Sequence, residues 1–75
     1  MNIYCGNIAY TTTEDDLRDL FSQHGEVSAV RVITDRDTGR SKGFGFVEMV
    51  DDGQAKEAIE ALDGKDFMGR DVRIN

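Results

Sequence analysis

The chain contains no proline and only one cysteine among its 75 residues. A single cysteine cannot form an internal disulfide, and without a cluster of other ligands it cannot build a zinc site. We therefore expect Cys5 to be a small buried apolar residue, and we expect no metal ion or cofactor. Linkers, low-complexity tracts and repeats of solenoid length are also absent. Because a chain this short cannot divide into two self-sufficient cores, residues 1–75 are expected to form one domain.

Long apolar runs are missing too. No segment approaches the ~18 residues that a membrane-spanning helix requires, and the first residues do not resemble a secretory signal. These features predict a soluble, cytoplasmic, monomeric protein. Its formal net charge is −6, which argues against binding polyanions through net charge alone. The basic charge is local, because residues 31–42 hold four cationic and two anionic side chains and are therefore +2.

Four strands are predicted from apolar alternation and turn residues. Residues 2–8 alternate around Ile3, Tyr4 and Cys5, and the β-branched run from Val27 to Ile33 suits a second strand. Turn-forming residues at 35–39 separate it from a third strand that ends at Met49. Residues 72–75 form the last strand.

Two helices are predicted between these strands. Thr13 and the acids that follow it are typical of a capping box, and Gly25 is expected to end the first helix. Asp51 or Asp52 begins the second, which ends at Asp63-Gly64. The fold class is therefore α+β, in the order β-α-β-β-α-β. Right-handed crossovers then place both helices on one face of a four-stranded antiparallel, ferredoxin-like sheet, which leaves the other face open.

Glu48 indicates which side chains of the third strand face the helices. Side chains alternate across a strand, so Glu48 shares a face with Phe44 and Phe46. Because burying an unpaired carboxylate is costly, Val47 and Met49 must face the helices. The same reasoning on the other strands gives an open face that carries Asn2, Tyr4, Arg31, Ile33, Phe44, Phe46, Glu48, Arg73 and Asn75. Exposed apolar patches of this kind usually mark a binding site.

The remaining aromatic residues have structural interpretations. Phe21 and Phe67 are expected in the core or at its edge, and Tyr10 is expected to pack at a loop. His24 has no nucleophile placed with it, so no catalytic constellation is predicted. The glycines near Lys42 lack the spacing of a phosphate-binding loop or a dinucleotide fingerprint.

Two segments resemble the signatures of the RNA recognition motif. Residues 42–49, Lys-Gly-Phe-Gly-Phe-Val-Glu-Met, fit the pattern K/R-G-F/Y-G/A-F-V-x-F/Y at every position but the last. Residues 3–8, Ile-Tyr-Cys-Gly-Asn-Ile, are similar to the second signature, whose functional feature is an aromatic residue in second place. Met49 departs from the pattern at a core position, where it affects packing only.

The resemblance implies a role for each open-face residue. Tyr4 and Phe46 would each stack on a base on a flat platform, and Phe44 would pack against the riboses. Phosphates or base edges would be contacted by Lys42, Arg40, Arg31 and Arg73, and base discrimination would come from groups near the end of the last strand, such as Asn75, with Asn2 also on the open face. Gly45 would let the sheet lie close to a helix.

The expected function is therefore binding of short single-stranded RNA, without catalysis and without a small-molecule substrate or a membrane. Two alternatives remain open. Single-stranded DNA would use the same platform and differ only in contacts to the 2′-hydroxyl. A protein-interaction module could use the acidic helical surface formed by Glu14, Asp15, Asp16, Asp19, Glu57, Glu60 and Asp63.

Overall fold

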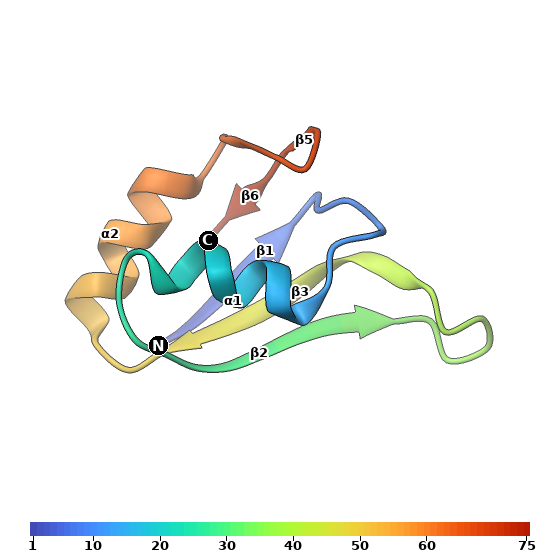
Figure 1. Cartoon of the computed structure of the whole chain (residues 1–75), viewed down its shortest axis with the longest axis horizontal. Coiled ribbons are helices and arrows are strands. Elements are labelled where there is room, and N and C mark those ends of the chain that lie inside the picture. Colours follow the sequence, from blue (N-terminus) through green and yellow to red (C-terminus); the bar gives the residue numbers. More distant parts are fainter.

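Four antiparallel strands and two helices form the body of the molecule (Figure 1). The computed structural model describes residues 1–75 and has the elements β1 (Asn2–Gly6), α1 (Glu14–Ser22), β2 (Val27–Thr34), β3 (Ser41–Met49), α2 (Asp52–Leu62), β4 (Asp66–Phe67), β5 (Arg70–Asp71) and β6 (Arg73–Ile74). The strand order in the main sheet is β2-β3-β1-β6. Helix α1 packs on β2 and β3, and α2 packs on β3 and β6. The predicted fold class and element order are confirmed.

The N-termini of both helices are capped as the sequence predicts. Thr13 and Asp16 form a capping box, in which each backbone N–H donates to the other's side chain at 2.9 and 3.1 Å. Asp51, and not Asp52, caps α2, because its carboxylate accepts the Gln54 N–H at 2.8 Å. The prediction for Gly25 was wrong: α1 already ends at Ser22.

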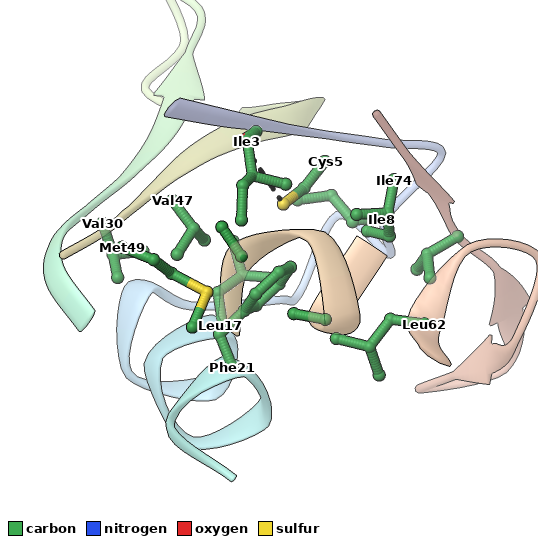
Figure 2. Close-up of a cluster of buried hydrophobic side chains, with 13 residues drawn as sticks. Ile3, Cys5, Ile8, Leu17, Phe21, Val30, Val47, Met49, Leu62 and Ile74 are labelled. Atoms are coloured by element: carbon green, nitrogen blue, oxygen red, sulfur yellow. Dashed lines mark hydrogen bonds between the residues drawn. The ribbon is translucent and has the colours of Figure 1, made fainter. Parts of the chain in front are cut away.

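Thirteen buried side chains fill the space between the sheet and the helices (Figure 2). Ile3 and Cys5 from β1 point toward Leu17 and Phe21 of α1, and Leu62 of α2 closes the far end. The prediction for Cys5 is confirmed, because its side chain is fully buried. Burial raises the pKa of its thiol to about 12 and keeps it protonated. Phe67 packs against the edge of this cluster. Neither helix is long and apolar enough to cross a membrane.

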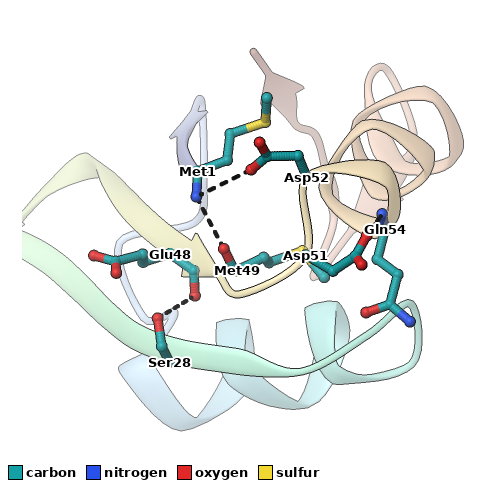
Figure 3. Close-up of polar contacts among 7 residues, drawn as sticks. All are labelled: Met1, Ser28, Glu48, Met49, Asp51, Asp52 and Gln54. Carbon is teal, nitrogen blue, oxygen red and sulfur yellow. Dashed lines mark hydrogen bonds and ion pairs between the residues drawn. The ribbon is translucent and has the colours of Figure 1, made fainter.

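Met1 and Asn75 are both hydrogen-bonded to strands of the sheet. The Met1 ammonium group donates to the Met49 carbonyl at 2.9 Å and lies 3.7 Å from the Asp52 carboxylate (Figure 3). At the other end, Tyr4 and Asn75 exchange both backbone hydrogen bonds, at 2.8 and 3.0 Å. Although β6 itself spans only two residues, these bonds continue its pairing with β1 as far as Asn75.

The β4–β5 hairpin was not predicted. Its two strands have two residues each, and its turn is formed by Met68 and Gly69, which both have positive φ (55° and 88°). Positive φ at both central residues is the geometry of a tight hairpin turn, which is usually indicated in a sequence by Asn-Gly or Asp-Gly. Met-Gly gives no such signal, so the sequence does not indicate this hairpin.

Candidate nucleic-acid interface

The strand register brings three aromatic side chains together on the face of the sheet that the helices leave open. Tyr4 of β1 lies opposite Phe46 of β3, and Gly6 lies opposite Phe44. The predicted alternation along β3 is confirmed, because Val47 and Met49 are buried while Phe46 is 39% exposed. Tyr4 is also 39% exposed, and Phe44 is half-buried. We call Tyr4, Phe44 and Phe46 the platform.

The three platform rings contact one another but are not coplanar. Their centroids are 5.9 to 6.3 Å apart, within the range of favourable aromatic pairs. Tyr4 and Phe44 are tilted by 31°, whereas Phe46 meets Tyr4 at 65° and Phe44 at 89°. The platform is therefore faceted, in contrast to the flat surface that the sequence predicts.

Two glycines shape the platform in different ways. A Cβ atom at Gly6 would lie 2.6 Å from the Tyr4 hydroxyl, so the missing side chain makes room for the Tyr4 ring. A Cβ atom at Gly45 would overlap the carbonyl oxygen of Arg31 on the neighbouring strand β2. The prediction that Gly45 allows close approach to a helix was therefore wrong. It allows the close approach of β2 to β3, where the register is irregular.

Cationic and amide side chains surround the platform. Arg31 lies opposite Phe46 and shares a shallow hollow with it and Asn2. Lys42 lines a second hollow beside Tyr4 and Phe44, and Arg73 and Asn75 line a third beside Tyr4. The one ion pair in the chain joins Met1 to Asp52, so none of these cationic groups is neutralised by a carboxylate contact. They are available for an anionic ligand.

Arg40 is the one predicted site residue that lies away from the platform. It lines a hollow at the base of the β2–β3 hairpin together with Tyr10 and Asp35. The resemblance to the family implied that Arg40 contacts phosphates or base edges. Near this end of β3, Gly43 has a positive φ of 84° and the register with β2 shifts between Val32 and Thr34.

Two carboxylates, those of Glu48 and Asp63, lie beside the platform. The Glu48 carboxylate extends away from the other side chains shown in Figure 3, and Glu48 shares the hollow of Arg31 and Phe46. Asp63 was expected on the helical surface opposite the platform. Instead its carboxylate accepts the Ile74 N–H at 2.9 Å and borders the hollow that contains Tyr4 and Arg73. Both carboxylates oppose phosphate binding.

Asn7 and Arg70 border the platform but were not predicted. Asn7 adopts a left-handed conformation (φ 54°) that asparagine tolerates well. Its amide donates to the Asp71 carbonyl at 2.8 Å and accepts from the Arg70 guanidinium at 2.7 Å. These bonds hold Arg70 at the edge of the hollow that contains Tyr4 and Phe44. Since the β4–β5 hairpin has no sequence signal, Arg70 could not be placed in advance.

Tyr10 was expected to pack at a loop, and this prediction was wrong. Its side chain is 72% exposed and belongs to no buried cluster. It follows Asn7 and Ile8 in the loop after β1 and lies beside Gly43, where an added Cβ atom would be 3.1 Å from the Tyr10 ring.

The chain contains no group of three or more histidine, cysteine or acidic side chains that could hold a metal ion.

Comparison with known proteins identifies this arrangement. The profile of the RNA recognition motif matches residues 3–73. The chain belongs to this family. It is 51% identical over 75 residues to the Nostoc protein named "Putative RNA-binding protein RbpB", a match that covers the whole chain and 73% of the relative.

Solved structures with the same motif agree in fold. The structure of RNA Binding Protein PG1 is 53% identical and superposes with a TM-score of 0.98, over the whole chain and 90% of that structure. The recognition motif of Rna15 with bound RNA (GU) is 34% identical with a TM-score of 0.87, over 99% of the chain and 79% of that structure. In this family, the paired signatures on β1 and β3 are the segments that form the platform here.

Proposed function

We propose that this protein binds short single-stranded RNA on its open sheet face, by stacking bases on the platform, without catalysing a reaction. The observation that carries the proposal is the contact of Tyr4, Phe44 and Phe46 on the face that no helix covers. Exposed aromatic groups in contact are costly in water and are favourable stacking surfaces for bases. The RNA-bound state of the related Rna15 motif supports the same assignment.

The surrounding charges would hold the phosphates. Arg31, Lys42 and Arg73 line three separate hollows beside the platform and form no ion pair within the chain. Asn2, Asn75 and the anchored Arg70 add hydrogen-bonding groups at the rim. Stacking supplies roughly 1–3 kcal/mol per base and depends little on base identity, so the platform provides affinity and the rim provides discrimination. The protein would act as a monomer that holds about two to four nucleotides.

A titration followed by NMR tests the proposal. Oligonucleotide pools rich in pyrimidines and in purines are added to the labelled protein, and the signals of the three platform residues are followed. The expected result is a shift of these signals that saturates, with little change at exposed α2 residues such as Glu57. Platform signals that stay in place with every pool would rule out the function. A matched DNA pool in the same titration measures the contribution of the 2′-hydroxyl.

The dependence of affinity on salt tests the phosphate contacts separately. For single strands, log K falls with log salt with a slope of about 0.7 for each phosphate contacted. Two to four contacts would therefore give a slope of about 1.4 to 2.8. Replacing Arg31 by Ala should lower the slope, whereas replacing Arg18 on α1 by Ala should not, because Arg18 donates to the Val27 carbonyl away from the platform. A salt-independent affinity would remove the cationic residues from the site.

A further inference from the structure

Glu48 is exposed on the open sheet face, beside a cationic group that is proposed to hold phosphate. Its position is fixed by the strand pairing, because Asn2 lies opposite it on β1 and the Ser28 hydroxyl donates to its carbonyl at 3.2 Å (Figure 3). Directly after it, the Met49 N–H donates to the Met1 carbonyl at 3.0 Å. A carboxylate repels phosphate, so a contribution of Glu48 to RNA binding must come from contact with a base.

The Phe46 ring has an apolar side and a polar side. On the apolar side, Tyr4 and Phe44 contact it at centroid distances of 5.9 and 6.3 Å. On the polar side, Arg31 lies opposite Phe46 on β2, and Glu48 lies two residues further along the same face of β3. A base stacked on Phe46 would therefore present one edge to Arg31 and Glu48.

A hollow of about 410 Å³ lies at this edge of the ring. Its lining consists of one aromatic, one cationic, one anionic and one amide side chain, which belong to Phe46, Arg31, Glu48 and Asn2. Ligand sites typically enclose ≈ 300–1,000 Å³, so the hollow suits a single base. The ring supplies a stacking surface that depends little on base identity, so any selectivity must come from the three polar side chains.

Arg31 and Glu48 carry opposite charges and share this hollow, yet they do not form an ion pair with each other. The one ion pair in the chain joins Met1 to Asp52. A guanidinium group only donates hydrogen bonds, and a carboxylate only accepts them. The hollow therefore presents free donors beside free acceptors, which a ligand with the complementary order of groups can bind.

Guanine is the base whose edge has this order. Its N1–H and N2–H donors lie side by side, so one carboxylate can accept both, and its neighbouring O6 and N7 atoms accept from a guanidinium group. In adenine and cytosine the amino group lies next to a ring nitrogen that accepts. In uracil the N3–H lies between two carbonyl oxygens. Each of these three bases would turn an acceptor atom toward the second carboxylate oxygen, which is unfavourable.

We propose that Glu48 makes the platform selective for guanine at Phe46, by accepting the N1–H and N2–H of the stacked base while Arg31 donates to its O6 and N7. The proposal rests on the proposed RNA-binding function and names the base preferred at one position of the bound strand. It also accounts for a carboxylate on a surface that binds phosphates. Glu48 reduces affinity for RNA in general and restores it for guanine alone.

Five short RNAs test this selectivity. Each has two uridines on either side of a central guanosine, inosine, adenosine, cytidine or uridine, and fluorescence anisotropy measures its affinity for the wild-type protein. The guanosine RNA should bind at least about fivefold more tightly than the adenosine, cytidine and uridine RNAs, the lower end of the value of a bidentate contact. Inosine lacks the N2 amino group and should lose part of this gain. Equal affinities for all five RNAs would disprove the selectivity and leave the RNA-binding function standing.

A Glu48→Ala variant shows whether the carboxylate is responsible. Because Glu48 is exposed, the variant should fold, and its circular dichroism verifies this. The ratio of guanosine to inosine affinity should fall to within about twofold of unity, whereas Glu57→Ala on α2, which removes the same charge elsewhere, should keep the wild-type ratio. With the uridine RNA, Glu48→Ala should bind somewhat more tightly than the wild type, because a charge that repels phosphate is lost. A guanosine-to-inosine ratio that Glu48→Ala leaves unchanged would overturn the proposal.

A Phe46→Ala variant tests where the guanine lies. It should weaken binding of all five RNAs and lose the guanosine preference at the same time, because no ring then holds the base beside Glu48. If the variant binds more weakly but keeps the full preference, guanine is read elsewhere on the protein, and the proposal fails while the RNA-binding function stands. If Phe46→Ala binds every RNA as the wild type does, the proposed function fails and the selectivity at Phe46 fails with it.

Discussion

The two faces of the main sheet use neighbouring residues of the same strands for opposite purposes. Ile3 is fully buried against the helices, while Tyr4, the next residue, is 39% exposed on the platform. Val47 and Phe46 repeat the contrast on β3. Because alternate side chains point to opposite faces, one strand carries both the residues that stabilise the fold and those proposed to bind RNA. Stability and binding should therefore be separable one residue at a time.

The largest effect is expected when the buried member of a pair is truncated. Ile3→Ala should lower the free energy of unfolding by about 2–5 kcal/mol, because Ile3 is fully buried and its truncation leaves a cavity in the core. Tyr4→Ala, the matched control on the same strand, should lower it less, by about 1–3 kcal/mol, the value of its two aromatic contacts. Urea denaturation followed by circular dichroism measures both. Equal losses in the two variants would contradict the division between faces.

Gly6 and Gly45 offer a second comparison, because an added Cβ atom at either position would clash with a neighbouring group. Gly45→Ala should lower the free energy of unfolding by about 1–3 kcal/mol, because the new methyl group would meet the Arg31 carbonyl, which cannot move away without shifting β2. Gly6→Ala would meet the end of the Tyr4 side chain, which can rotate. It should therefore reduce RNA affinity more than stability. Denaturation and RNA titration of both variants test this, and a larger stability loss in Gly6→Ala would reverse the assignment.

Removing a platform ring should affect binding more than stability. Phe46→Ala is expected to weaken RNA binding roughly 5- to 150-fold, corresponding to one stacked base. Phe46→Tyr keeps a ring at the same position and serves as the control. Fluorescence anisotropy with a labelled RNA pool measures the affinities. A variant without the ring that binds like the wild type would show that bases do not stack on Phe46.

A smaller effect is expected at Glu48, the anionic residue beside Arg31 and Phe46. Glu48→Gln removes a charge that repels phosphate and should raise affinity by about two- to fivefold at low salt. The gain should shrink as salt is added, because exposed charges are screened over about 8–10 Å at moderate ionic strength. Glu57→Gln on α2 is the control for total charge. A similar gain in that variant would mean that net charge, and not the position of Glu48, limits binding.

The smallest effect concerns pH and the β2–β3 hairpin. The N–H groups of Thr38 and Asp37 lower the pKa of Asp35, so its bonds stabilise the folded state above the unfolded pKa of about 3.9. This contribution is lost as the pH falls through the lower, folded value. The difference in stability between wild type and Asp35→Asn should therefore be largest near neutral pH and shrink in acid. A difference that stays constant down to about pH 2 would show that the carboxylate charge does not contribute.

Several elements could be predicted because the responsible forces are local. The capping box at Thr13 depends on residues three positions apart, and the alternation along β3 depends on the polarity of Glu48. The same holds for the core cysteine. These signals lie within single segments of the chain, so the fold class and the platform followed from them together with the resemblance to the family.

Other features depend on contacts between distant segments. Arg70 reaches the platform because Asn7, 63 positions earlier in the chain, accepts its hydrogen bond. The role of Gly45 depends on how closely β2 approaches, and the Tyr10 ring lies beside Gly43, which is distant from it in the sequence. A sequence pattern does not encode these distances.

The sequence by itself determined which face of each strand is apolar, where the helices begin, and that three aromatic residues share one surface, because these follow from the periodicity of the backbone. Only the tertiary structure decided how those rings are tilted and which cations surround them. It also decided that Arg40 lies beside Tyr10, away from the platform. Packing between segments sets these relations, since a register shift or a left-handed glycine redirects a side chain without changing the hydrophobic pattern.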